Sequence, residues 1–209
     1  NVRGRAATSG FNFEFDLVTP LGTRATTLAL AGEHNLRNAL GAAAAAYAAG
    51  ATVDQIVDGL GAMRAVAGRL ELKPAIHGAF LIDDSYNANP SSLRAGLDTL
   101  QSLGGRRWLV LGDMLELGTG ADELHSQIGA YARETGIEHL WAIGPRSKFA
   151  VKAFGKGGMW FDSIEELITA VQSALAPSVT VLIKGSRANK LERVAGALSI
   201  GAPTVAGGH

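Results

Sequence analysis

The fold is decided by one stretch of sequence, Phe80-Leu81-Ile82-Asp83-Asp84-Ser85-Tyr86-Asn87-Ala88-Asn89-Pro90-Ser91-Ser92. Its apolar start predicts a buried strand that ends at two carboxylates. Pro90 suits the first position of a helix with Asn89 as N-cap, because proline loses no hydrogen bond there. Polar groups between a strand's carboxyl end and a helix N-terminus occupy the usual ligand position of an open α/β sheet. An ordinary loop with polar caps is the alternative that this stretch leaves open.

From residue 79 onward, short apolar runs alternate with amphipathic helical segments, the pattern of a buried parallel sheet. The expected strands are 80–82, 108–111, 140–143, 159–161 and 179–183. We therefore predict the α/β class, with a Rossmann-like, mostly parallel sheet and helices on both faces over residues 78–200. A tail at 201–209 has no pattern and is expected to be disordered.

Residues 1–77 carry a different pattern, which predicts a β-hairpin followed by two helices. Alternation places four apolar residues on one strand face, namely Phe11, Phe13, Phe15 and Leu17. A turn at 19–23 leads to a second strand at 24–30. An alanine-rich helix to about residue 49 follows, and Thr52 begins a capping box. We place the domain boundary at 74–78, where regular β-α alternation begins.

Composition excludes several classes of function. Lysine plus arginine and aspartate plus glutamate number 19 each, so no global attraction to nucleic acid or to a membrane surface is expected. The absence of cysteine excludes disulfides and fits a reducing compartment. No apolar segment reaches the length of a membrane span and no signal peptide is visible.

Three polar or glycine-rich loops follow the predicted strands, at 83–92, 112–118 and 184–187. Because the carboxyl ends of parallel strands share one edge, these loops should meet there. Lys184 and Arg187 before a helix suit phosphate or carboxylate. An ammonium group would suit the acidic side chains, which are Asp83, Asp84, Asp113 and Glu116. The alternative is that these loops are polar only because they lie at the surface.

Two asparagines three residues apart, Asn35 and Asn38, should share one face of the alanine-rich helix. Their amides offer a donor and an acceptor, as an adenine edge requires. The alternative is a capping residue and a solvated asparagine. Neither GxGxxG after the first strand of the second region nor a Walker GxxxxGK[ST] sequence is present, which disfavours the common dinucleotide and phosphate loops.

Taken in order, the motifs of this chain resemble those of the Mur ligases over residues 2–198. They are Gly-Glu-His-Asn-Leu-Arg-Asn-Ala-Leu at 32–40, Gly-Arg-Leu-Glu at 68–71, Asp-Asp-Ser-Tyr-Asn-Ala-Asn-Pro at 83–90, Gly-Asp-Met-Leu-Glu-Leu-Gly at 112–118 and Lys-Gly-Ser-Arg at 184–187. The last two motifs point to the branch that joins D-alanyl-D-alanine to UDP-N-acetylmuramoyl-tripeptide. The resemblance implies a monomeric, cytoplasmic enzyme of peptidoglycan synthesis.

The resemblance also implies a reaction. ATP phosphorylates the terminal carboxylate of the tripeptide, and the amine of D-alanyl-D-alanine attacks the acyl phosphate. ATP and Mg²⁺ are the implied cofactors, and the family's phosphate loop and metal ligands fall before Asn1. We therefore expect 1–77 to be the end of the central ATP-binding domain, 78–200 to be the carboxy-terminal ligase domain, and the chain alone to be inactive. A non-catalytic Rossmann-like module that binds a small ligand is the alternative.

Site residues are carried over by position in the motifs, and none of them is a metal ligand. The resemblance implies catalytic roles for Arg69 and Asp84. Nucleotide binding is implied for Asn35, Asn38, Arg69, Asp84, Tyr86 and Asn87. Dipeptide binding is a secondary hypothesis for Asn89, Asp113, Glu116, Lys184, Ser186 and Arg187.

Overall fold

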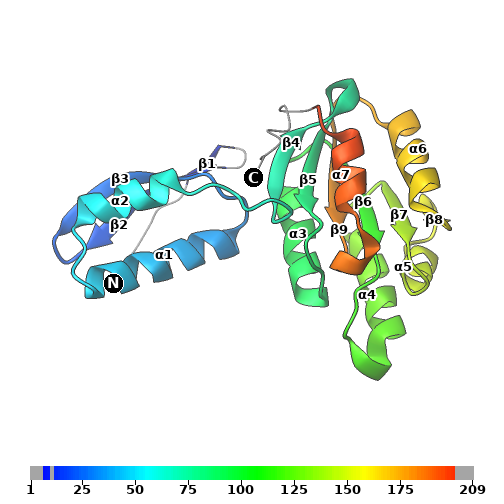
Figure 1. Ribbon diagram of the computed structural model, residues 1–209, viewed down its shortest axis with the longest axis horizontal. Helices are drawn as coiled ribbons and strands as arrows, with labels where there is room; N and C mark the ends of the chain where they lie inside the picture. The colour runs from blue at the N-terminus through cyan, green and yellow to red at the C-terminus, as the bar shows by residue number, and fades with distance from the viewer. Residues whose placement is uncertain (1–6, 10–11, 201–209) are drawn as a thin grey trace, which may run out of the picture. The chain divides into compact units, whose positions relative to one another are not determined.

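A computed structural model describes residues 7–9 and 12–200 of the chain (Figure 1). The chain forms two compact units, Asn1–Val66 and Ala67–His209, each with its own hydrophobic core. The tail expected at 201–209 and the side chain of Phe11 lie outside the described residues. No helix in the described part of the chain is long and apolar enough to cross a membrane.

The first unit is an antiparallel sheet whose inner face packs against two helices. The elements are β1 (Ala7–Ser9), β2 (Asn12–Thr19), β3 (Gly22–Leu28), α1 (Glu33–Ala48) and α2 (Val53–Ala62). Buried and exposed residues alternate along β2, so Phe13, Phe15 and Leu17 enter the core. The predicted hairpin is confirmed. Its second strand begins two residues early because Thr19 pairs with Gly22, which leaves a two-residue turn.

The second unit is built on a six-stranded sheet with the order β4-β5-β9-β6-β7-β8. The strands are β4 (Glu71–Pro74), β5 (Phe80–Asp84), β6 (Arg106–Gly112), β7 (His139–Ile143), β8 (Gly158–Phe161) and β9 (Val179–Lys184). Pairing is parallel throughout β5 to β9, and only β4 is antiparallel to its neighbour. The predicted mostly parallel sheet and its five strands are confirmed.

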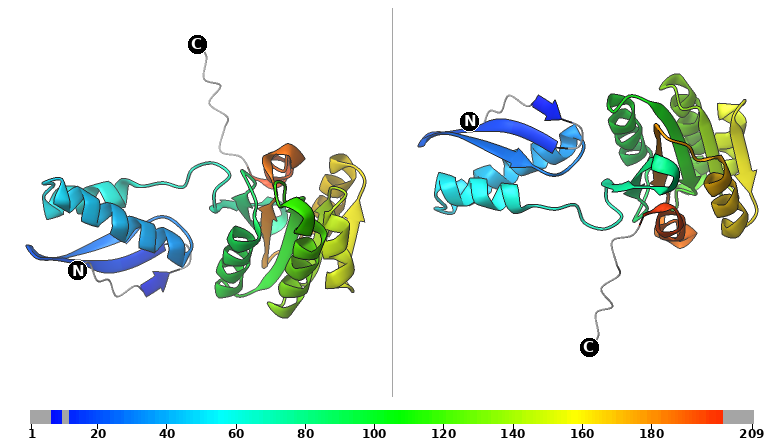
Figure 2. Two further views of the ribbon diagram at one scale, coloured as in Figure 1. Left: turned by 90° about the horizontal axis from the view of Figure 1, so that it is seen from below. Right: turned by 90° about the horizontal axis from the view of Figure 1, so that it is seen from above.

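Helices cover both faces of this sheet, as predicted (Figure 2). They are α3 (Pro90–Ser102), α4 (Ala121–Glu134), α5 (Ser147–Phe154), α6 (Ile164–Ala174) and α7 (Glu192–Leu198). Val110 and Val181 share a core cluster with residues of α6 and α7. Leu182 points to the opposite face, where α3 approaches so closely that a Cβ on Gly96 would lie 3.1 Å from it.

The boundary between the units lies earlier than the predicted 74–78. Strand β4 pairs with β5, with Glu71 opposite Asp83 and Pro74 opposite Phe80, so residues 71–77 belong to the second unit. The change to β-α alternation marks only where the parallel strands begin. An antiparallel edge strand leaves no such mark in the sequence.

Helix starts follow the expected capping chemistry. Asn89 accepts a hydrogen bond from the Ser92 N–H at 2.8 Å, with Pro90 at the first helical position. Thr52 forms the expected capping box with Gln55. These caps fix where each loop ends, and the cap of α3 closes the loop that follows β5.

Candidate functional site

Three loops meet at the carboxyl ends of the adjacent strands β5, β9 and β6. They surround a pocket of about 460 Å³. The lining residues are Tyr86, Asn87, Ala88 and Asn89 after β5, Leu115, Glu116 and Leu117 after β6, and Ser186, Arg187 and Ala188 after β9. The expected gathering of three polar loops at one sheet edge therefore produces a cavity in the size range of small-molecule sites.

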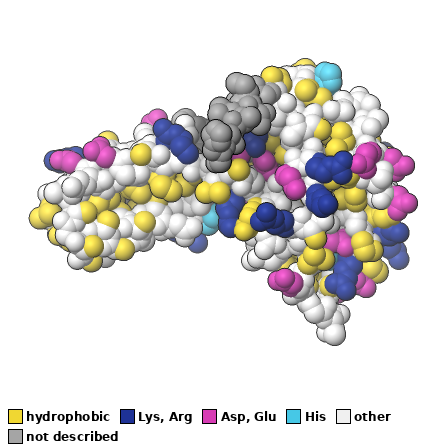
Figure 3. Space-filling view, in the orientation of Figure 1, with side chains coloured by type: hydrophobic (Ala, Val, Ile, Leu, Met, Phe, Trp, Pro, Cys, Tyr) yellow, Lys and Arg dark blue, Asp and Glu magenta, His cyan; other side chains and the backbone are white. Residues whose placement is uncertain are grey.

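Glu116 and Arg187 bring opposite charges to this pocket. Both side chains are exposed, and neither is ion-paired with another described residue. The backbone of Glu116 has a φ of 61°, in the left-handed region that non-glycine residues rarely adopt. Acidic and basic side chains are interspersed over the visible face of the second unit (Figure 3). Charge of one sign therefore does not dominate that face.

Asn189 and Ser186 join the β6 and β9 loops. Asn189 accepts from the Asp113 N–H at 3.1 Å and donates to the Asp113 carbonyl at 2.9 Å. The Ser186 hydroxyl accepts from the Leu115 N–H at 2.9 Å. Ser186 is buried, so its hydroxyl serves the loop. The sequence analysis missed Asn189. Its side chain packs against Gly112, where a Cβ would lie 2.7 Å from it.

His125, in α4, holds the same loop from the other side. The side chain is fully buried, and its Nε2 accepts from the Met114 N–H at 2.9 Å. Its Nδ1 lies 2.6 Å from the carbonyl oxygen of Ala121, which can only accept, so Nδ1 carries the proton. The sequence analysis missed His125, because a single histidine in a helix carries no motif.

Asp113 was expected to bind the dipeptide, but it does not line the pocket. Its carboxylate is buried and accepts from the Arg146 N–H at 3.1 Å and the Ser147 N–H at 2.7 Å. These donors lie at the start of α5, where a carboxylate is favoured by unsatisfied N–H groups and by the helix dipole. Gly144 is needed beside it, since a Cβ there would lie 2.5 Å from the carboxylate. Asp113 is therefore a helix cap in this structure.

Asp84 and Lys184, both expected to bind ligand, pair with each other beneath the loops. Lys184 Nζ lies 2.5 Å from Asp84 Oδ2 and donates to the Asn87 carbonyl at 3.0 Å. Asp84 Oδ1 accepts from the Leu70 N–H at 3.2 Å. Both residues are buried, so these charges stabilise the loop bases from inside.

Asp83 is bound on the other side of β5. Its Oδ1 accepts from the Ser85 hydroxyl at 2.6 Å, and its Oδ2 lies 2.9 Å from Lys73 Nζ. Lys73 also reaches Glu71 at 2.9 Å. Burial acts to lower the pKa of Lys73, but its bonds to Glu71 and Asp83 together outweigh that effect and raise the pKa above 10.5. Asp83 therefore ties β5 to β4.

Arg69 and Arg187 both approach the ring of Tyr86. Their guanidinium carbons lie 4.4 Å and 5.5 Å from the ring centroid, within cation–π range. Tyr86 is 42% exposed, and the residues before and after it in its loop are Ser85 and Asn87. Asn87 uses its side-chain oxygen to accept from the Ala88 N–H at 2.8 Å. This arrangement brings two predicted arginines and one predicted tyrosine together.

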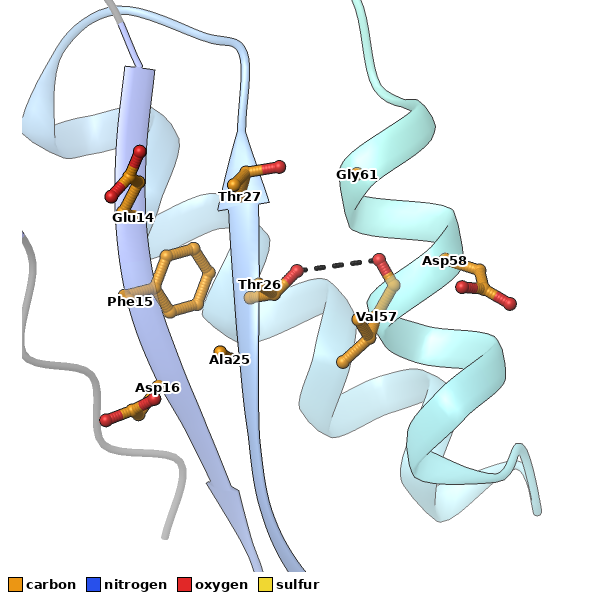
Figure 4. A pocket seen from close by; sticks show the side chains of 9 residues that line it. All are labelled: Glu14, Phe15, Asp16, Ala25, Thr26, Thr27, Val57, Asp58 and Gly61. Carbon is orange, nitrogen blue, oxygen red and sulfur yellow. Dashed lines mark hydrogen bonds between the residues drawn. The ribbon is translucent and has the colours of Figure 1, made fainter. Parts of the chain in front are cut away.

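The predicted asparagines of the first unit lie on α1. Asn35 donates from Nδ2 to the Ala31 carbonyl at 2.7 Å, and Asn38 is exposed. A separate pocket of about 710 Å³ in this unit lies between β2, β3 and α2, where Thr26 Oγ1 donates to the Val57 carbonyl at 3.5 Å (Figure 4). It contains no predicted site residue. Among the described residues, the charged side chains that line it are Glu14, Asp16 and Asp58, which do not suit an anionic ligand.

Residues 7–9 and 12–200 contain no group of three histidine, aspartate or glutamate side chains placed to hold a metal ion.

Comparison with known proteins places the second unit in a family. The model described as "Mur ligase, glutamate ligase domain" matches residues 68–187. The chain belongs to the Mur ligase family. The match begins at the second residue of the second unit and covers every pocket-lining residue except Ala188. The site described above is therefore a feature of the Mur ligase domain of this chain.

Two curated relatives within the Mur ligase family are both named UDP-N-acetylmuramoyl-tripeptide–D-alanyl-D-alanine ligase. The protein from Escherichia coli is 41% identical over 187 residues, covering 88% of this chain and 41% of the relative. The protein from Haemophilus influenzae is 36% identical over 186 residues, covering 86% and 40%. The chain thus spans about two fifths of the length of the curated relatives it matches.

Solved structures of Mur ligases share this fold. A MurF crystal structure from Acinetobacter baumannii has a TM-score of 0.84 at 32% identity, covering 93% of this chain and 44% of that one. A MurF ligase from Thermotoga maritima, solved in complex with ADP, has a TM-score of 0.79 at 21% identity, covering 92% and 44%. The α/β architecture is therefore that of the family.

Proposed function

We propose that this chain belongs to an ATP-dependent ligase of peptidoglycan biosynthesis that joins D-alanyl-D-alanine to UDP-N-acetylmuramoyl-tripeptide. The support is the name shared by relatives at 41% and 36% identity, together with the family match over 68–187. Because the chain covers about two fifths of those relatives, the activity is proposed for the whole protein and not for these 209 residues alone.

The observation that carries the proposal is the pair of opposite charges in the pocket. D-alanyl-D-alanine is a zwitterion, with an ammonium group at one end and a carboxylate at the other. The Glu116 carboxylate suits the ammonium group, and the Arg187 guanidinium suits the carboxylate with a two-pronged hydrogen bond. Both are free of competing ion pairs with described residues. We assign the pocket to the dipeptide.

Each unit, taken by itself, also carries groups that suit a nucleotide. Arg69 carries an exposed guanidinium stacked near Tyr86 and without an ion pair to a described carboxylate, which leaves its N–H groups for a phosphate. The exposed amide of Asn38 suits an adenine edge. When bound, ATP would supply the phosphoryl group that turns a carboxylate oxygen into a leaving group. We propose that Mg²⁺ is held by residues outside this chain, and that residues 1–66 belong to the ATP-binding part of the protein.

Asp84 then acts indirectly. Its bond to the Leu70 N–H fixes the backbone next to Arg69, and its pair with Lys184 fixes the base of the Asn87 loop. The role proposed for these side chains is to hold binding groups in place. Positioning of this kind, with charge stabilisation, is the main protein contribution to a reaction whose activation comes from ATP.

The test is kinetic, on the full-length ligase. Glu116→Gln and Arg187→Gln should each raise the KM for D-alanyl-D-alanine roughly tenfold or more, as expected for loss of a charge-assisted hydrogen bond, with the KM for ATP changed less. Lys190→Gln is the matched control, because Lys190 is exposed in the same loop but does not line the pocket. An unchanged dipeptide KM in both pocket variants would remove the dipeptide from this pocket.

A further inference from the structure

Three consecutive backbone N–H groups lead into Glu116, and each is held by a side chain from another segment. Asn189 accepts from Asp113, His125 accepts from Met114 and Ser186 accepts from Leu115. The distances from these three nitrogens to their acceptors are 3.1 Å to Asn189 Oδ1, 2.9 Å to His125 Nε2 and 2.9 Å to Ser186 Oγ. The next residue along is Glu116, with its backbone in the left-handed region.

We propose that His125 is a positioning residue for the dipeptide, acting through the Met114 N–H to present the Glu116 carboxylate to the ligand's ammonium group. The proposal rests on the assignment of the pocket to D-alanyl-D-alanine. Asn189 and Ser186 belong to the β9 loop, so they fix the β6 loop only relative to its neighbour. His125 belongs to α4, so it fixes the β6 loop relative to one of the helices that cover the sheet.

The geometry leaves His125 one way to make this contact. The ring is fully buried, and its Nδ1 proton is directed to the Ala121 carbonyl, so Nε2 has only a lone pair to offer. The Met114 side chain is also fully buried. Without an acceptor at Nε2, the Met114 N–H must find another partner, and the loop has to move for it to do so. Such a movement displaces Glu116, which is held in a conformation it does not favour by itself.

Two substitutions test the hydrogen bonds of the two ring nitrogens separately. In His125→Gln, the terminal amide reaches the position of Nε2, and its oxygen can still accept from Met114. In His125→Asn, the shorter amide reaches the position of Nδ1 and can still donate to Ala121, but the Met114 N–H loses its acceptor. Each variant removes one hydrogen bond from the same buried site, so they form a matched pair that differs in which bond is lost.

The experiment measures kcat and both KM values in the full-length ligase. His125→Asn is expected to raise the KM for D-alanyl-D-alanine about tenfold, with the KM for ATP within about twofold, whereas His125→Gln stays within about threefold of the wild type. In a Glu116→Gln background, His125→Asn should add nothing, because its effect passes through that carboxylate. Equal effects of the two His125 variants, or full additivity with Glu116→Gln, would overturn the proposal.

A measurement on the unmodified enzyme covers the case in which His125→Asn does not fold. The Met114 amide should exchange with solvent as slowly as amides inside β6, since it is bonded to a buried ring. Fast exchange at Met114 would refute the contact without any variant. The two proposals also fail separately. If Glu116→Gln leaves the dipeptide KM unchanged, the pocket assignment is wrong. If Glu116→Gln raises it and His125→Asn does not, only the role of His125 is wrong.

Discussion

Asp84 and Lys184 face each other across the neighbouring parallel strands β5 and β9, in register, with Lys184 Nζ 2.5 Å from Asp84 Oδ2. The two side chains are 12% and 3% exposed. The same ammonium group donates to the Asn87 carbonyl, so one buried charge fixes a strand pair and a pocket loop together. The polar stretch after β5 is thus supported from below by a buried pair of charges.

Lys184→Met should lower the free energy of unfolding of the chain by about 3–5 kcal/mol, because it removes one member of a buried ion pair. Urea denaturation followed by circular dichroism measures this change. The double variant Lys184→Met with Asp84→Asn removes both charges and should lose less than the sum of the two single variants. A loss below about 1 kcal/mol for Lys184→Met would show that the pair does not form in solution.

Asp113→Ala should also destabilise the chain, by about 1–3 kcal/mol, because the N–H groups of Arg146 and Ser147 lose a buried carboxylate acceptor. Asp122→Ala is the control, since Asp122 is exposed and its carboxylate lies 3.8 Å from Arg146. That change should stay within about 0.5 kcal/mol. If Asp113→Ala is as mild as Asp122→Ala in thermal unfolding, Asp113 is not the cap of α5.

The fold of the second unit was predictable because its signals are local. Short apolar runs and capping residues such as Asn89 and Pro90 act within a few residues, and each appears where it was expected. Strand order was not predictable. Strand β9 inserts between β5 and β6, and this pairing joins residues about 100 positions apart, such as Asp84 and Lys184. Strand β4 was missed as part of this sheet because it is an antiparallel edge strand that precedes the regular β-α alternation, which begins at β5.

The candidate site was predictable only at the level of loops. Six of the residues that line the pocket had been expected to serve two ligands, the nucleotide for Tyr86 and Asn87 and the dipeptide for Asn89, Glu116, Ser186 and Arg187. Polar composition indicates that a loop faces a sheet edge but not which side chains turn inward. Asp113 and Lys184 turn inward because an unsatisfied helix start and a buried carboxylate lie there. His125 was not predictable, since its partner is a backbone N–H eleven positions away in a loop of no regular structure.

Gly129→Ala tests the contact between α4 and α5. A Cβ at Gly129 would lie 2.0 Å from the carbonyl oxygen of Ala150, so the helices must move apart. The unfolding free energy should fall by about 1–3 kcal/mol or more. Gly196→Ala is the matched control, because Gly196 lies inside α7 with open space around its Cβ position. There the higher helix propensity of alanine should raise stability by about 0.5–1 kcal/mol. Equal thermal shifts for both variants would contradict the close approach of the helices.

Lys73 gives a prediction of pH dependence, because its pKa is raised by its bonds to Glu71 and Asp83 against the opposing effect of burial. A group whose folded-state pKa exceeds its unfolded value stabilises the fold below the unfolded pKa, near 10.5, and loses that contribution as the pH rises through the folded value. The wild type should therefore exceed Lys73→Gln in stability by roughly 1 kcal/mol near neutral pH. The difference should hold to about pH 9.5 and shrink above about pH 10.5.

Urea denaturation at a series of pH values, for the wild type and Lys73→Gln, measures this difference. Lys152→Gln is the control, since Lys152 is exposed on α5 and is paired with no described residue. Its stability difference from the wild type should be small and flat over the same range. A Lys73→Gln difference that is already lost at about pH 9 would mean that Lys73 does not bridge Glu71 and Asp83, because only that double contact overcomes the burial of its charge.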